Sequence, residues 1–114
     1  MSWKKAKSFC TRLGARMVVV ESEEERKEIT RMTADLIKKR VRFWLDGQKI
    51  AGKWKTHQGS TKPSYTPWGS IKCYCYGDCI RSGPETKWYK EKCHVKKVGG
   101  GYTFNPLCKQ YGND

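Results

Sequence analysis

The chain has 114 residues, of which 24 are lysine or arginine and 11 are aspartate or glutamate, so its formal net charge is +13. This length suggests a single domain, and with 37% hydrophobic residues its core is modest. No apolar run approaches the roughly 18 residues of a membrane-spanning helix, and no secretory leader is visible at the start. The charge favours anionic partners such as sulfated or carboxylated glycans, bacterial envelope polymers, acidic proteins or nucleic acid, although solubility alone could also account for it.

Six cysteines indicate covalent support for this small core. An even count in an extracellular chain is typical of a disulfide framework, whereas such bridges are rare in reducing compartments. We therefore expect a secreted or extracellular protein whose leader, if it had one, has been removed.

The first part of the chain predicts two amphipathic helices with a strand between them. Residues 3–13 carry apolar side chains at helical spacing, and Gly14 is a suitable stop. These side chains are Trp3, Ala6, Phe9, Cys10 and Leu13. Residues 17–20 are a methionine and three valines, which is typical of a buried strand. Ser22 and Glu25 then have the spacing of a capping box that opens the second helix.

The second helix combines an apolar stripe with charges at both ends. Its expected inner face consists of Ile29, Met32, Thr33 and Leu36. The acidic run 23–25 suits the positive N-terminal end of a helix, and the basic run 38–40 suits the negative C-terminal end. The longer basic run 38–42 is also of a kind that binds heparin, so helix electrostatics and binding both remain open for it.

Two hairpins are predicted after the helices. Residues 43–47 indicate a strand and turn, with a return at residues 52–54. Residues 79–93 indicate the second hairpin, with turn formers at 82–86 and an aromatic return strand at 87–90. A cysteine lies at each end of this segment, so one bridge would join both of its strands.

These landmarks form a series that runs through the chain. In order they are Trp3-x-x-Ala6-x-x-x-Cys10, Gly14-Ala15, Ser22-x-x-Glu25, Phe43-Trp44-Leu45-Asp46-Gly47, Gly52-x-Trp54, Gly59, Trp68-Gly69, Cys79, Trp88, Cys93 and Cys108. In order and spacing the series resembles a C-type lectin-like domain over nearly the whole chain. The resemblance implies a single domain over residues 1–114 with an α+β fold, in which two helices pack on small antiparallel sheets beside a long, disulfide-stapled loop region.

The same resemblance implies positions for particular residues. It places Trp44 in the core and pairs Cys10 with Cys108 and Cys79 with Cys93. Two features depart from the family. Its members usually begin with a strand or hairpin that is missing or shortened here, so the last strand is expected to have an open edge. The segment between the last two cysteines is also longer than usual and contains a triple-glycine turn.

Sugar-binding members of this family hold calcium with oxygen ligands. These come from a Glu-Pro-Asn-like or Gln-Pro-Asp-like triplet in the long loop and from an Asn-Asp pair after the final tryptophan. Here residues 69–76 contain no such triplet, and Tyr89 and Lys90 follow Trp88. A lysine in that position would repel a divalent cation. The sequence therefore predicts a domain with no metal cofactor and no calcium-dependent sugar binding.

Basic and aromatic residues occupy this region instead. Aromatic faces can stack on sugar rings or cations, and ammonium groups can contact sulfate, phosphate or carboxylate. The candidate ligand-binding residues are Tyr65, Lys72, Tyr74, Tyr76, Lys87, Tyr89, Lys90 and Lys92. Because side chains alternate along a strand and Trp88 is expected inside, we expect Lys87 and Tyr89 to be the more exposed. Trp68, like Trp88, is expected to pack in the core.

The resemblance assigns no partner to Cys73 and Cys75. They could bridge each other in a tight loop, bridge another chain, or remain thiols. Alternatively, Cys73, Cys75 and Cys79 together with Cys93 or His94 could hold zinc, although this spacing is not a common one for zinc.

No Ser/His/Asp or Cys/His arrangement and no phosphate-binding loop is recognisable, so we do not expect an enzyme. His57 is predicted to be an ordinary surface histidine. The sequence predicts a secreted, calcium-independent recognition domain that binds anionic glycans or microbial surface polymers. The alternatives are a protein-binding receptor-like or venom-like subunit of the same fold and, more remotely, a zinc-dependent nucleic-acid-binding module. A homodimer could form through Cys73 and Cys75 or through the open sheet edge.

Overall fold

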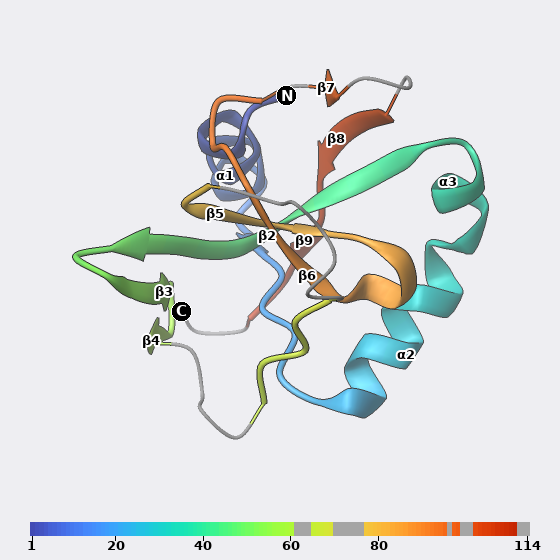
Figure 1. Ribbon diagram of the computed structural model, residues 1–114, viewed down its shortest axis with the longest axis horizontal. Coiled ribbons are helices and arrows are strands. Elements are labelled where there is room, and N and C mark those ends of the chain that lie inside the picture. The colour runs from blue at the N-terminus through green and yellow to red at the C-terminus, as the bar shows by residue number, and fades with distance from the viewer. Residues whose placement is uncertain (61–64, 70–76, 96, 99–101, 112–114) are drawn as a thin grey trace.

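The structure is a computed structural model that describes residues 1–60, 65–69, 77–95, 97–98 and 102–111. Helices and short strands surround one long central strand, β2 (Figure 1). The elements are α1 (Trp3–Arg12), β1 (Arg16–Met17), α2 (Glu23–Met32), α3 (Ala34–Lys38), β2 (Val41–Ile50), β3 (Lys53–Thr56), β4 (Gly59–Ser60), β5 (Cys79–Ser82), the 3-10 helix η1 (Pro84–Thr86), β6 (Trp88–Glu91), β7 (Lys97–Val98), β8 (Tyr102–Pro106) and β9 (Cys108–Lys109). None of the described helices is long and apolar enough to cross a membrane.

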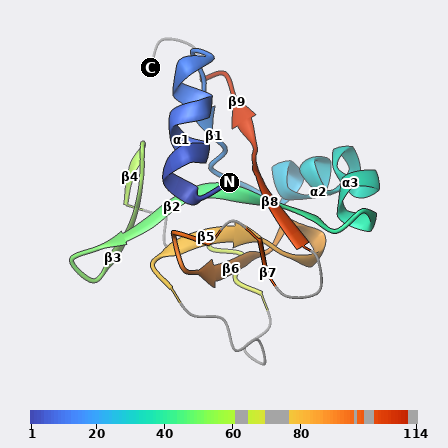
Figure 2. The ribbon, with the colours of Figure 1, turned by 90° about the horizontal axis from the view of Figure 1, so that it is seen from above.

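Strand β2 is the centre of the larger sheet. The strands follow the order β4-β3-β2-β5-β6 with antiparallel pairing, and β8 runs parallel to the first half of β2. Residues 43–47 of β2 are all buried, as expected for a strand that is covered on both faces. Figure 2 shows α1 on one side of β2, with β5 and β6 on the other.

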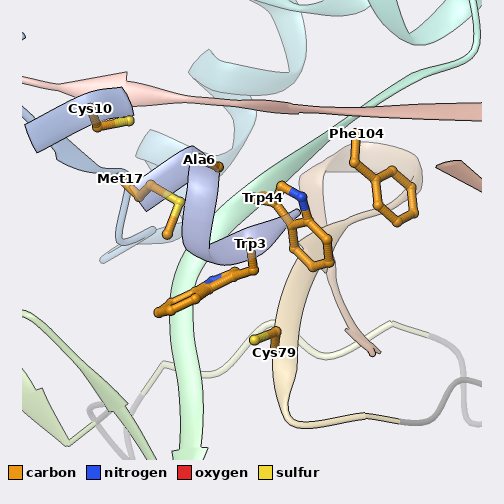
Figure 3. Packing of buried hydrophobic residues seen from close by; sticks show 7 residues of the cluster. All are labelled: Trp3, Ala6, Cys10, Met17, Trp44, Cys79 and Phe104. Atoms are coloured by element: carbon orange, nitrogen blue, oxygen red, sulfur yellow. The ribbon is translucent and has the colours of Figure 1, made fainter. Parts of the chain in front are cut away.

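The core has two parts, which lie on opposite faces of β2. Trp44 points toward α1 and packs edge-on against Phe104 of β8, with ring centroids 5.0 Å apart (Figure 3). Its neighbour Leu45 points the other way, to a cluster with Ile80 and Trp88. This alternation follows from the two-residue period of a strand. The prediction that Trp44 is a core residue is confirmed.

Helix α1 closes the first part of the core. Trp3, Ala6 and Cys10 are buried, and the Trp3 indole donates a hydrogen bond to the Leu45 carbonyl over 2.9 Å. Phe9 and Leu13, which were expected on the same stripe, are 38% and 59% exposed. The buried positions are spaced by three and four residues, so positions 9 and 13 fall at the border of that face.

Within the described residues, two disulfides connect distant parts of the fold. Cys10 of α1 is bonded to Cys108 of β9, and Cys79 of β5 is bonded to Cys93, which follows β6. The Cα atoms are 5.4 Å and 5.2 Å apart, respectively. These pairings match those implied by the resemblance. Strand β9 also pairs with β1. Cys73 and Cys75 lie outside the described residues.

The second predicted helix is divided at Thr33. The Ser22 hydroxyl accepts a hydrogen bond from the Glu25 amide at 3.1 Å, as the capping box predicts, but α2 ends at Met32 and α3 starts at Ala34. Thr33 is buried and Ile29 packs against the core, as expected. Met32 and Leu36 are 73% and 42% exposed, so their expected place on the inner face was wrong. The division at Thr33 changes the direction of the chain before the stripe can continue.

The last part of the chain forms two short strands rather than one. Strand β8 lies between β2 and β7, and β9 pairs with β1 in a separate two-stranded sheet. The β8 strand therefore has a neighbour on each side over part of its length, which reduces the open edge expected there.

Candidate functional site

The β5–β6 hairpin is the frame of the candidate site. Its register pairs Ile80 with Lys90 and Ser82 with Trp88, and the Ser82 hydroxyl accepts a hydrogen bond from the Phe43 amide of β2 over 2.9 Å. Strand β5 is almost fully buried, whereas β6 is at the edge of the sheet. The hairpin is thus anchored through β5 and presents β6.

A row of three tryptophans crosses this hairpin. The ring centroids of Trp54 and Trp68 are 5.4 Å apart, as are those of Trp68 and Trp88. Trp88 is buried, whereas Trp54 and Trp68 are half-buried and so reach the surface. The Lys90 ammonium lies 5.7 Å from the Trp68 ring centroid, within the range of a cation–π contact. The expected packing of Trp68 and Trp88 is therefore present, and the partly exposed Trp68 ring lies beside a cation.

Lys87 and Tyr89 are less exposed than expected. The Tyr89 ring lies against Gly69 and Gly83, where an added Cβ atom would collide with it, and the Arg81 guanidinium is 5.1 Å from the ring centroid. Lys87 is half-buried and forms an ion pair with Glu85 at 3.5 Å. Strand alternation alone does not show that Gly69 and Gly83 leave space for the Tyr89 ring.

The acidic groups near β6 already have cationic partners. Glu91 is 3.3 Å from the Arg81 guanidinium and accepts a hydrogen bond from the Lys92 amide, and Glu85 pairs with Lys87. Lys90 and Lys92 are exposed, and within the described ranges no ion pair joins either ammonium to a carboxylate. Their charge is directed to solvent.

Tyr65 has a structural partner. Its hydroxyl donates a hydrogen bond to Glu23 of α2 at 3.0 Å, and burial followed by this bond raises the pKa of Tyr65 to about 12. Bonds from Arg26 and then Tyr65 lower the pKa of Glu23 to about 2. Tyr65 therefore connects its loop to α2.

Arg26 connects α2 to η1, a role that the sequence does not indicate. Only 7% exposed, it pairs with Glu23 at 2.7 Å and donates to the Glu85 carbonyl of η1. Thr30 and Thr86 add a hydroxyl contact of 2.7 Å between the same two elements. The spacing of Glu23 and Arg26 gives a helical ion pair, but nothing in the sequence indicates that the arginine turns inward.

His57 is not a surface residue, contrary to the prediction. Its side chain is 9% exposed, and its Nδ1 atom is 2.5 Å from Asp46 Oδ2 on β2. Tyr111 packs edge-on against the imidazole at 4.6 Å and accepts a hydrogen bond from the Val19 amide through its hydroxyl. The β2–β3 hairpin brings Asp46 and His57 together, so the pair closes this end of the sheet.

Tyr89 and Lys90, the described residues at the expected calcium position, do not supply the oxygen ligands that a calcium ion needs. The Tyr89 ring is packed between glycines, and Lys90 supplies a positive charge rather than an oxygen ligand. In the part of the chain that is described, no group of three or more His, Cys, Asp or Glu side chains could hold a metal. Five of the predicted residues, Lys72, Cys73, Tyr74, Cys75 and Tyr76, lie outside the described residues.

Comparisons with known proteins agree with this architecture. The family model described as "Lectin C-type domain" matches residues 1–98. Among solved structures, the chain is similar to the carbohydrate-recognition domains of the mouse and human scavenger receptor C-type lectins, each with 22% identity and a TM-score of 0.67. Each alignment covers 82% of this chain, together with 73% of the mouse chain and 75% of the human chain. Human lithostathine has 20% identity and a TM-score of 0.67, covering 82% of this chain and 69% of that one. A comparison with curated proteins finds no match.

Proposed function

The chain belongs to the C-type lectin domain family, and from this premise we propose that it is a secreted, non-catalytic domain that binds anionic glycans or microbial surface polymers without calcium. Membership of the family supports recognition of a carbohydrate or a protein. The anionic ligand and the independence from calcium are proposed from the residues of this chain.

The observation that carries the proposal is the position of Lys90. Its ammonium is exposed beside the half-buried Trp68 ring, and the nearby carboxylates of Glu85 and Glu91 are engaged by other cations. A sugar ring can stack on an indole face while an acidic substituent contacts an adjacent ammonium. Lys92 is a second exposed cation on the same strand end.

Calcium independence is supported by the same residue. A divalent ion held by oxygen ligands would lie close to the Lys90 ammonium and be repelled by it. The formal net charge of +13 adds a long-range repulsion to cations and an attraction to polyanions. The ligand charge rather than a bridging metal would then supply the affinity.

Titration of the whole chain with heparin fragments tests this function. We expect binding at low salt that weakens as the salt concentration rises, because exposed charges are screened over about 8 Å at physiological ionic strength. Addition of EDTA should leave the affinity unchanged. Lys90→Gln should weaken binding about threefold to fivefold, a typical effect for one exposed charge contact, and Lys27→Gln on α2 serves as the control of equal charge.

Three outcomes of this titration would contradict the proposal. Absence of binding at low salt would rule out an anionic glycan, and loss of binding in EDTA would rule out calcium independence. Silence toward glycans together with affinity for a protein ligand would favour the protein-binding alternative.

A further inference from the structure

A basic groove runs along α1, away from the β6 edge. It encloses a volume of about 970 Å³ between α1, the end of β2 and the segment after β6. Its cationic lining residues are Lys4, Lys7 and Arg12, and His94 lies on the opposite wall. We propose that this groove is a second ligand-binding surface, which holds a linear anionic polysaccharide along the helix.

The cations of the groove lack acidic partners. The first acidic residue of the chain is Glu21, so α1 contains none, and no acidic side chain is among the described residues that line the groove. Across the described ranges, no ion pair joins Lys4, Lys7 or Arg12 to a carboxylate. Their mutual repulsion is therefore relieved only by solvent or by an external anion.

Helix stability does not explain the placement of these charges. The N-terminal end of a helix carries a partial positive charge, which disfavours cations in the first turn. Helix α2 follows this rule with three glutamates in its first turn, but α1 has no acidic residue there and carries Lys4 in its first turn. Lys4 lines the groove at this position, where an external anion would offset the unfavourable electrostatics.

The spacing of the groove residues fits an extended polymer. Lys4, Lys7 and Arg12 line one face of α1, and eight residues of helix cover about 12 Å along its axis. One small anion cannot contact all three, whereas successive acidic groups of a chain can. The hydroxyls of Ser8 and Thr11 lie between them on the same face.

A polysaccharide fits this groove better than a nucleic acid. Proteins that bind single strands stack the bases on exposed aromatic rings. The aromatic residue of the groove is Trp3, which is 4% exposed and has the Lys7 ammonium 5.4 Å from its ring centroid. The tryptophan therefore positions a lysine and leaves no open face for a base.

The groove and the β6 surface can be tested separately. Figure 2 shows α1 and β6 on opposite sides of β2. The groove does not include Lys87 or Lys90, so this inference goes beyond the proposed function. One wall of the groove is held in place by the hydrogen bond from the Trp3 amide to the Cys93 carbonyl over 2.9 Å.

The test compares two triple variants of equal charge by titration with heparin fragments. The groove variant is Lys4→Gln/Lys7→Gln/Arg12→Gln, and the control is Lys5→Gln/Lys27→Gln/Lys53→Gln, whose residues are exposed and do not line the groove. Each lowers the formal net charge from +13 to +10, since 13 − 3 = 10. We expect the groove variant to lose about tenfold in affinity and the control about twofold or less.

Salt dependence and ligand choice give independent readouts. The slope of log affinity against log salt should become shallower by about one for each bound cation removed in the groove variant, and remain steeper in the control. Hyaluronan fragments, which carry only carboxylates, show whether sulfate is needed, and for either polymer a larger loss in the groove variant than in the control supports the inference. A single-stranded oligonucleotide that binds more tightly than heparin of the same charge would overturn it.

The outcomes separate the two surfaces. Equal losses of affinity in the groove variant and the control would overturn the proposal that the groove binds a polysaccharide. If Lys90→Gln weakens binding in the same series, the β6 proposal still stands. A tenfold loss in the groove variant with no effect of Lys90→Gln supports the groove and contradicts the β6 proposal. A wild-type chain that binds no anionic polysaccharide overturns both. Far-UV circular dichroism of each variant confirms that the fold is retained.

Discussion

The first turns of α1 and α2 have the same kind of N-cap but opposite charges at the third helical residue. Ser2 and Ser22 both cap a helix with a hydroxyl that accepts an amide hydrogen, from Lys5 at 3.4 Å and from Glu25 at 3.1 Å. In α2 the third helical residue is a glutamate, the residue type that the Ser-x-x-Glu pattern of a capping box requires. In α1 the equivalent residue is Lys5, so its first turn keeps an electrostatic penalty.

Replacement of Lys5 by glutamate should therefore stabilise the protein. The change would create the Ser-x-x-Glu capping box and remove a cation from the positive end of the helix, for a gain of about 0.5–1 kcal/mol. Thermal denaturation should show a midpoint a few degrees higher, as expected for a domain of this size. Lys5→Met, which removes the charge but cannot complete the box, should give a smaller gain. An unchanged or lower midpoint in Lys5→Glu would mean that α1 does not experience this penalty.

At the scale of elements, contacts between α2 and η1 hold the turn of the β5–β6 hairpin. Glu85 and Thr86 of η1 have positive φ values of 61° and 57°, which are unfavourable for residues other than glycine. Arg26 binds the Glu85 carbonyl and Thr30 contacts the Thr86 hydroxyl. These contacts hold the turn that leads directly into β6, so the position of Lys90 depends on α2.

Removal of the Arg26 side chain should weaken the contacts between α2 and η1. Arg26→Ala deletes charge-assisted hydrogen bonds from a buried side chain and should lower the free energy of unfolding by about 2–3 kcal/mol. Lys27→Ala, at the exposed neighbouring position, should change it by less than about 0.5 kcal/mol. Urea denaturation measures both. If the two variants are equally stable, Arg26 contributes nothing and the turn is held by the hairpin itself.

At the scale of the whole molecule, patterns within one element could be predicted from the sequence and contacts between elements could not. The capping box at Ser22 depends on local spacing, whereas the resemblance implied the core position of Trp44 and both disulfides. The Asp46–His57 pair depends on the hairpin register, and the Lys90–Trp68 contact depends on a loop that lies beside Trp88. Such contacts have no period in the sequence.

The two disulfides should contribute unequally to the stability of the whole fold. They span 98 and 14 residues of chain. In the chain-entropy model, closing these loops in the unfolded state stabilises the native state by about 4.7 and about 3 kcal/mol, respectively. Cys10→Ala/Cys108→Ala should therefore lower the free energy of unfolding by about 1.7 kcal/mol more than Cys79→Ala/Cys93→Ala.

Urea denaturation of the two double variants measures this difference directly. Both pairs include a fully buried cysteine, Cys10 in one and Cys79 in the other, so the loss of core packing is similar and largely cancels in the comparison. Heparin binding should show the opposite order, because the Cys79–Cys93 bridge fixes the hairpin that carries Lys90. A larger loss of stability from the shorter loop would show that the bridges act through native contacts rather than through the unfolded chain.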